Sequence, residues 1–162
     1  MKMGEVNLTE KILVIDDEQS TLNMLRLLLS ACGYTVLTAD NGETGLEIFR
    51  QEAPGIVLTD IRMPGLDGIE VLKQLKTMDT KVEVIVITGH GDMEIAIQAL
   101  QHEATDFINK PIQKQALDVA LRRAQEKISL KKQRDQYTHN LEGKVKEATA
   151  ELTKSWRRLE SL

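Results

Sequence analysis

Short apolar runs alternate with stretches of helical periodicity along residues 1–111. Continuous runs rich in β-branched residues are typical of strands that are covered on both faces of a sheet. Such runs predict strands at 12–15, 34–39, 56–59, 82–88 and 105–109. Apolar residues at helical spacing predict helices between them, at 19–31, 43–52, 69–78 and 92–102. Strands that alternate with helices in this way indicate an α/β fold, in which a doubly wound parallel sheet carries helices on both faces.

Residues 112–162 follow a different pattern. They contain no proline and one glycine, Gly143, and strong helix formers dominate them. Residues 1–111 hold 9 Lys and Arg against 18 Asp and Glu, a net charge of −9, whereas residues 112–162 hold 12 against 7, a net charge of +5. The sequence therefore predicts an N-terminal tail at 1–10, a folded domain at 11–128 and a long helical extension at 129–162.

The extension carries a seven-residue apolar repeat. Val145, Leu152 and Leu159 recur at this spacing, with Leu141 and Ala148 at the alternate positions. Such a stripe is typical of a coiled coil, so we expect a homodimer through the C-terminal helix. Polar residues interrupt the repeat between 131 and 138, so two helices with a polar joint fit the pattern as well as one continuous helix.

The composition bounds the class of protein. The 162 residues are 41% hydrophobic and 28% charged, which is enough for a packed core. The single cysteine, Cys32, excludes an intramolecular disulfide and a cysteine-based zinc cluster, and its apolar neighbours predict a small core residue. No apolar run approaches a membrane-spanning length. We therefore expect a cytoplasmic protein with no membrane partner.

Polar side chains with related chemistry end four of the predicted strands. Asp16 and Asp17 follow the first strand, Asp60 the third, Thr88 ends the fourth, and Lys110 follows the fifth. The carboxyl ends of parallel strands lie at one edge of a sheet, where α/β proteins bind ligands. One polar residue at a strand end is common and carries little information. Together, these five predict a shared site.

The residue types at this edge indicate phosphoryl chemistry. Three neighbouring carboxylates repel one another, so they need a cation or a raised pKa. An open set of oxygen ligands suits Mg²⁺, which keeps water and accepts a phosphate oxygen. The ammonium of Lys110 and the hydroxyl of Thr88 suit phosphoryl oxygens. A carboxylate nucleophile in such surroundings can form an aspartyl phosphate.

Four motifs in order resemble the receiver domain of bacterial two-component response regulators, over about residues 10–128. They are LVIDDE at 13–18, Asp60 with MPGLDG at 63–68, VITGHG at 86–91 and DFINKP at 106–111. The resemblance implies a flavodoxin-like fold with strand order 2-1-3-4-5. It also implies a signalling protein rather than an enzyme, one that catalyses only its own phosphorylation and dephosphorylation.

The resemblance assigns the acidic residues. Asp60 would be the phosphoacceptor and would take the phosphoryl group from a sensor histidine kinase. Asp17 would bind Mg²⁺ directly, and Asp16 largely through water. Asp60 and the backbone carbonyl of Arg62 would complete the protein ligands of the metal.

The resemblance also assigns a switch. Thr88 and Phe107 would rearrange together on phosphorylation, while Lys110 would contact the phosphoryl group and precede a cis peptide bond to Pro111. Related receivers often carry glycine where this chain has Glu103. We therefore expect a left-handed helix cap to be lost there and the surface around it to be altered.

Two other functions fit the sequence less well. A phosphatase with an aspartate nucleophile needs Asp-x-Asp at the first strand end, whereas Asp16 and Asp17 are adjacent. Nucleic-acid binding by the basic extension is disfavoured, because no helix-turn-helix pattern follows the basic run at 131–134. An output domain is not recognisable in residues 1–162, so either the protein is longer or the coil itself is the output.

Overall fold

The computed structural model describes residues 10–161, so the predicted tail at 1–10 lies, apart from Glu10, outside the described residues. The strands are β1 (Lys11–Ile15), β2 (Thr35–Ala39), β3 (Ile56–Asp60), β4 (Glu83–Thr88) and β5 (Asp106–Asn109). The helices are α1 (Gln19–Ala31), α2 (Gly42–Glu52), α3 (Gly68–Met78), α4 (Met93–Gln101) and α5 (Lys114–Glu160). These bounds agree with the predicted elements to within one or two residues.

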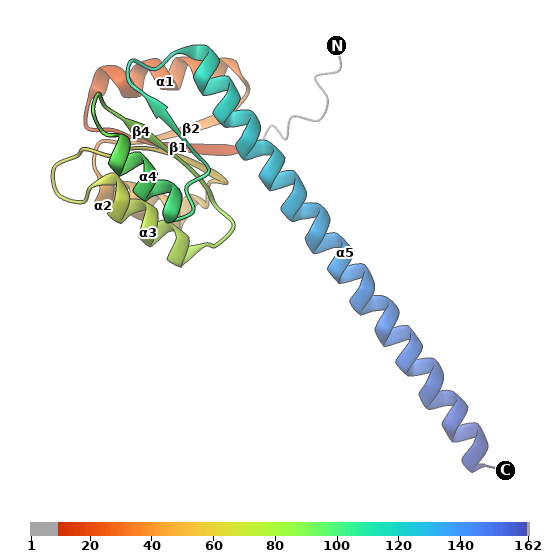
Figure 1. Ribbon diagram of the computed structural model, residues 1–162. Coiled ribbons are helices and arrows are strands. Elements are labelled where there is room, and N and C mark those ends of the chain that lie inside the picture. The colour runs from red at the N-terminus through yellow and green to blue at the C-terminus, as the bar shows by residue number, and fades with distance from the viewer. Residues whose placement is uncertain (1–9, 162) are drawn as a thin grey trace. The chain divides into compact units, whose positions relative to one another are not determined.

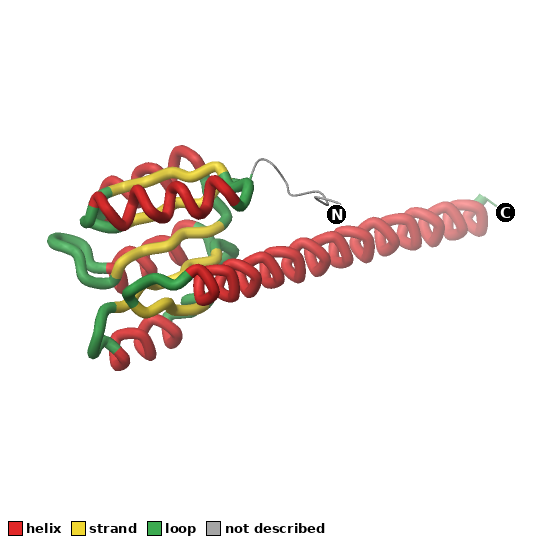
Figure 2. Tube along the Cα trace, turned by 90° about the horizontal axis from the view of Figure 1, so that it is seen from above, coloured by secondary structure: helices red, strands yellow, loops and turns green. Residues whose placement is uncertain are grey.

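The five strands form one parallel sheet in the order β2-β1-β3-β4-β5, as predicted (Figure 1). Helices cover both faces of the sheet, which Figure 2 shows from a second direction. The register pairs Ile15 with Thr59 across β1 and β3, and Thr88 with Asn109 across β4 and β5. Because every strand runs the same way, the carboxyl ends of β1, β3, β4 and β5 share one edge of the sheet.

Alternate residues of each strand feed two cores. Leu13 and Ile15 of β1 join the core under α2, α3 and α4, whereas Ile12 and Val14 join the core under α1 and the first part of α5. All four side chains are fully buried. The continuous apolar runs in the sequence therefore reflect strands that are covered on both sides.

Cys32 is exposed, so the prediction of a core cysteine was wrong. It lies one residue beyond the end of α1, whose buried stripe is Leu22, Leu25 and Leu29. The chain turns there through Gly33, which has a φ of 95°. The turn takes Cys32 off the face that packs against the sheet.

Glu103 corrects a second expectation. Its φ is 69°, so it adopts the left-handed conformation that glycine favours, and the cap at the end of α4 is kept rather than lost. Two backbone hydrogen bonds close this turn, from Glu103 N to Leu100 O at 3.0 Å and from Ala104 N to Ala99 O at 3.0 Å. They hold the turn although a side chain at positive φ costs about 1 kcal/mol.

The chain divides into two compact units, one ending at Ile128 and one beginning at Ser129. In the first unit, α5 buries Leu117, Ala120, Leu121 and Ala124 against the sheet. In the second unit the helix continues to Glu160 without a break at the polar positions 131–138. The structure therefore has one helix where the sequence allowed one or two. None of the helices within residues 10–161 has the length and apolarity that a bilayer span requires.

Candidate functional site

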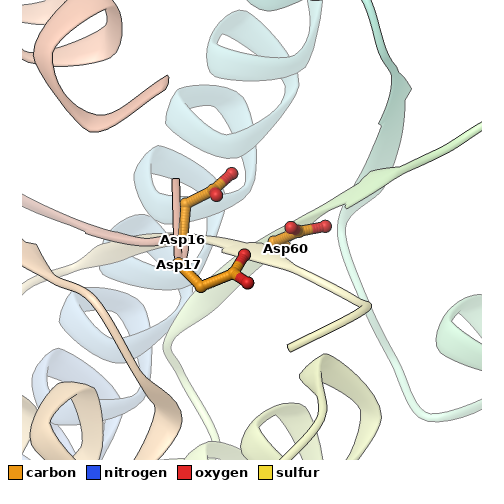
Figure 3. Close-up of side chains that lie close together, drawn as sticks. All are labelled: Asp16, Asp17 and Asp60. Atoms are coloured by element: carbon orange, nitrogen blue, oxygen red, sulfur yellow. The ribbon is translucent and has the colours of Figure 1, made fainter. Parts of the chain in front are cut away.

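Three aspartates meet at the carboxyl edge of the sheet. Asp16 and Asp17 directly follow β1, and Asp60 is the last residue of the neighbouring strand β3. Each offers a carboxylate oxygen, and these oxygens lie within 4.8 Å of one another (Figure 3). The parallel sheet thus brings together residues that are more than forty positions apart in the chain.

The three carboxylates differ in their surroundings. Asp16 is fully buried and Asp60 is 5% exposed, whereas Asp17 is exposed. Asp16 Oδ1 accepts a hydrogen bond from the backbone N–H of Glu18 at 2.8 Å. Asp16 Oδ2 is buried and accepts no hydrogen bond from the described residues, and its charged neighbour is Lys110 Nζ at 3.3 Å. A buried carboxylate oxygen without a donor is costly, which is why such groups usually pair with a cation.

Burial and mutual repulsion make the buried pair harder to ionise. Burial raises the pKa of Asp60, and the charge of Asp16 raises it further, while Lys110 opposes both effects. Burial likewise raises the pKa of Asp16, against the hydrogen bond from Glu18 and the charge of Lys110. The site therefore holds more negative charge than its own groups neutralise.

Lys110 is the cation of the site. Its Nζ lies 3.2 Å from Asp60 Oδ2, to which it donates a hydrogen bond, and 3.8 Å from Glu18 Oε1. The peptide bond to Pro111 is cis, as the resemblance implied. Burial lowers the pKa of Lys110, but the charges of Asp60 and Asp16 outweigh it, so the pKa is raised. The ammonium stays charged beside the two carboxylates.

Thr88 ends β4 close to these residues but donates its hydroxyl elsewhere. Thr88 Oγ1 donates to Asn109 Oδ1 at 2.6 Å, and Ile108 O is the next acceptor at 3.4 Å. Phe107 is half-buried and packs against the core on the α2–α4 side of the sheet. The structure thus brings Asp16, Asp17, Asp60 and Lys110 together. The hydroxyl of Thr88 instead donates to Asn109 on the neighbouring strand β5.

An ion pair links the two loops beside the site, and sequence reasoning missed it. Arg62, two residues after Asp60, donates from Nε and Nη2 to the carboxylate of Asp92 at 2.5–3.0 Å. Asp92 also accepts from the backbone N–H of Gly89 at 3.2 Å, and it makes no capping hydrogen bond to α4. The hydrogen bond from Arg62 holds the pKa of Asp92 below its usual range. In the sequence Asp92 is predicted only as the first residue of a helix, and no residue near it in the chain indicates that it pairs with Arg62.

The donor set fits a hard divalent cation. Three carboxylates converge, one of them exposed and two buried, and Asp16 Oδ2, which makes an ion pair with Lys110 but accepts no well-formed hydrogen bond from the described residues, belongs to the same cluster. Oxygen ligands of this kind suit Mg²⁺, which binds through one or two carboxylates and keeps several waters. A cation there would neutralise the excess negative charge and offset the cost of burying it.

Comparison with known proteins identifies relatives of this chain. The family model described as the response regulator receiver domain matches residues 12–122. The C4-dicarboxylate transport transcriptional regulatory protein DctD of Pseudomonas aeruginosa is 42% identical over 116 residues, which are 72% of this chain and 25% of that protein. The transcriptional regulatory protein FixJ of Bradyrhizobium diazoefficiens is 36% identical over 113 residues, 70% of this chain and 55% of that protein.

A solved structure supports the same relationship. The crystal structure of a response regulator receiver domain protein from Clostridium thermocellum aligns with a TM-score of 0.69 at 38% identity. The alignment covers 76% of this chain and 97% of that structure. This chain therefore spans a whole receiver structure, but only between a quarter and about half of these curated relatives.

Proposed function

The chain belongs to the response regulator receiver domain family of two-component systems, and from that premise we propose that it is a switch operated by phosphorylation of Asp60. A sensor histidine kinase would supply the phosphoryl group. The observation that carries the proposal is the position of Asp60, which ends β3 with its carboxylate 3.2 Å from Lys110 Nζ and within 4.8 Å of carboxylate oxygens of Asp16 and Asp17. This arrangement places the nucleophile beside one cationic group, Lys110, and beside two carboxylates that could hold a metal cation.

The reaction needs a positioned anion and groups that neutralise the charge of the phosphoryl oxygens. An oxygen of Asp60 attacks phosphorus, and the new O–P bond forms as the P–N bond of a phosphohistidine breaks, leaving the electron pair on the imidazole. Because the carboxylate is already an anion, no general base is required. Phosphoryl transfer depends mainly on alignment and charge neutralisation, and the ammonium of Lys110 contributes to the latter.

Magnesium would bind among the same acidic residues. Asp17 would bind it directly, Asp16 largely through water, and Asp60 and the backbone carbonyl of Arg62 would complete the protein ligands. When bound, the ion supplies positive charge to the phosphoryl oxygens. The buried Asp16 Oδ2, whose cationic neighbour among the described residues is Lys110, supports this assignment.

The signal would leave the site through Thr88 and Phe107. The hydroxyl of Thr88 would turn to a phosphoryl oxygen, and the half-buried ring of Phe107 would follow it. The extension at 129–162 would then relay the change, as a homodimeric coil or to an output domain in a longer protein. The chain acts only on its own aspartate, so we class it as a regulator rather than an enzyme.

Phosphorylation by a small donor tests the assignment of Asp60. We expect acetyl phosphate to label the wild-type protein only with Mg²⁺ or a similar cation, and to leave Asp60→Asn unlabelled. Intact-protein mass spectrometry measures the added mass. Exposed Asp40 is a matched control, because Asp40→Asn removes a carboxylate outside the cluster and should label normally. Equal labelling of wild type and Asp60→Asn would refute the assignment.

A second test separates the metal ligands from the phosphoryl contacts. Thr88→Ala and Lys110→Ala should bind Mg²⁺ about as well as wild type, because neither side chain is a proposed ligand. Asp17→Ala should weaken binding by at least about tenfold, the size of effect typical of changes at metal sites. Titration with Mg²⁺, followed by NMR of the backbone amides, measures all three. A loss in Lys110→Ala as large as that in Asp17→Ala would show that the roles are misassigned.

A further inference from the structure

The hydroxyl of Thr88 already has a partner in this structure. A threonine hydroxyl has one proton to donate, and here it goes to the side-chain oxygen of Asn109 at 2.6 Å. Thr88 is 1% exposed, so solvent hardly reaches it, whereas Asn109 is exposed. For the hydroxyl to serve a phosphoryl group on Asp60, the bond to Asn109 has to break.

The pairing of two strands in the sheet places Thr88 and Asn109 side by side. Thr88 and Asn109 are register partners at the carboxyl ends of the parallel strands β4 and β5. The backbone N–H of Lys110 donates to Thr88 O at 2.7 Å, which fixes the strand ends next to each other. The competing acceptor, Ile108 O, lies at 3.4 Å and binds more weakly. Asn109 is therefore the side chain that holds the hydroxyl.

We infer that Asn109 is a positioning residue that holds the Thr88 hydroxyl away from Asp60 and so weakens binding of a phosphoryl group. The inference rests on the proposed function and adds a residue that opposes the switch. A ligand can shift a two-state equilibrium only by its differential affinity for the states. A hydrogen bond made only in the unphosphorylated state lowers the apparent affinity for the ligand of the other state.

The inference predicts the direction and size of a mutational effect. Asn109→Ala removes the acceptor, so the full-length protein should bind Mg²⁺–beryllofluoride, a phosphoryl mimic, more tightly than wild type. The net value of one hydrogen bond corresponds to about a 2- to 10-fold change. Affinity is measured by NMR titration of the backbone amides. The side chain is exposed, so the variant should fold like wild type.

Control variants separate a specific role from a structural one. Asn23→Ala makes the same chemical change at an exposed position on α1 and should leave affinity unchanged. In a Thr88→Val background, Asn109→Ala should have no effect, whereas in Thr88→Ser, which keeps the hydroxyl, the increase should persist. A double-mutant cycle of this kind isolates the coupling between two side chains.

The outcomes are distinguishable. If wild type binds the mimic and Asn109→Ala binds it equally or more weakly, the inference is overturned and the proposed function stands. An effect that persists at full size in Thr88→Val also overturns it, because the hydroxyl would not be involved. If Thr88→Val does not fold, an absent increase in Thr88→Ser decides against it in the same way. If wild type and Asp60→Asn behave alike toward the mimic, the proposed function itself fails.

Discussion

At the scale of single residues, the site is defined by negative charge that the protein does not fully neutralise. Lys110 is one cation between two buried carboxylates, and the exposed Asp17 adds a third carboxylate nearby. Burial is the main reason why the pKa of both Asp16 and Asp60 is raised. The unliganded domain thus gives up stability at neutral pH to keep these groups ionised at the edge of the sheet.

This cost predicts a stabilised variant. In EDTA at pH 7, Asp60→Asn should melt a few degrees above wild type, because removing one buried charge is worth on the order of 1 kcal/mol. The folded pKa of Asp60 lies above the unfolded value near 3.8, so wild type gains stability as the pH falls through the folded pKa. The difference should therefore shrink as the pH falls toward 4. Thermal denaturation followed by circular dichroism measures both trends.

Magnesium provides the control for this experiment. Added Mg²⁺ should raise the melting temperature of wild type more than that of Asp60→Asn, since a ligand stabilises the state that binds it. A variant less stable than wild type in EDTA, at every pH, would contradict the charge argument. It would point to a lost contact with Lys110 as the dominant effect.

The site residues that could be predicted from the sequence differ in kind from the side-chain contacts that could not. Asp60 and Lys110 were predictable, because a parallel sheet sends every strand end to one edge and a position along the chain is enough to place them. The hydrogen bond from Thr88 to Asn109 and the ion pair of Arg62 with Asp92 were not predictable. They depend on the register of β4 and β5 and on side-chain directions across two loops, which periodicity does not encode.

At the scale of the elements, α3 begins directly against the strand that carries Asp60. Gly68, its first residue, donates its N–H to Ile61 O at 2.8 Å. A Cβ at Gly68 would lie within 3.0 Å of the backbone of Asp60 and Ile61. Asp67 caps the helix by accepting from Glu70 N at 2.9 Å. The close approach of helix and strand therefore fixes the backbone of Asp60.

A methyl group at Gly68 should disrupt both packing and site. Gly68→Ala is expected to destabilise the domain by about 1–3 kcal/mol, since the group met is backbone and cannot rotate away. It should also slow phosphorylation of Asp60 by moving its backbone. Gly143→Ala is the control, because a Cβ there meets nothing within 4 Å and a helix-interior alanine gains about 0.5–1 kcal/mol over glycine. Chemical denaturation and acetyl phosphate labelling measure the two effects, and a neutral Gly68→Ala would contradict the close packing.

Element bounds were predictable where hydrophobic periodicity decides them and less so at their ends. The buried runs of β1, β3 and β4 left little choice of structure. Cys32 was misplaced because its neighbours are apolar although the helix has already ended. Glu103 was misjudged because backbone hydrogen bonds, rather than residue type, hold the left-handed turn after α4.

At the scale of the whole molecule, the second unit presents an apolar stripe that no residue within 10–161 covers. Val145, Leu152 and Leu159 are 62–64% exposed and Leu141 is 43% exposed. They share one side of a helix at the seven-residue spacing at which two helices pack around each other. Helices gain most of their stability by burying such a face. A second copy of the chain has the same stripe, so the seven-residue repeats of the two helices have the same spacing and can pack against each other.

The full chain should therefore be a dimer at tens of micromolar, whether or not Asp60 is phosphorylated. Val145→Glu and Leu152→Glu should each raise the dissociation constant at least about tenfold, because each places a charge in the apolar contact. Ala150→Glu introduces the same charge on the opposite side of the helix and should leave the dimer intact. Sedimentation equilibrium measures all of them, alongside a chain that ends at Ser129, which should be monomeric. A monomeric wild type, or equal effects of Ala150→Glu and Leu152→Glu, would show that the stripe serves another partner or remains solvated.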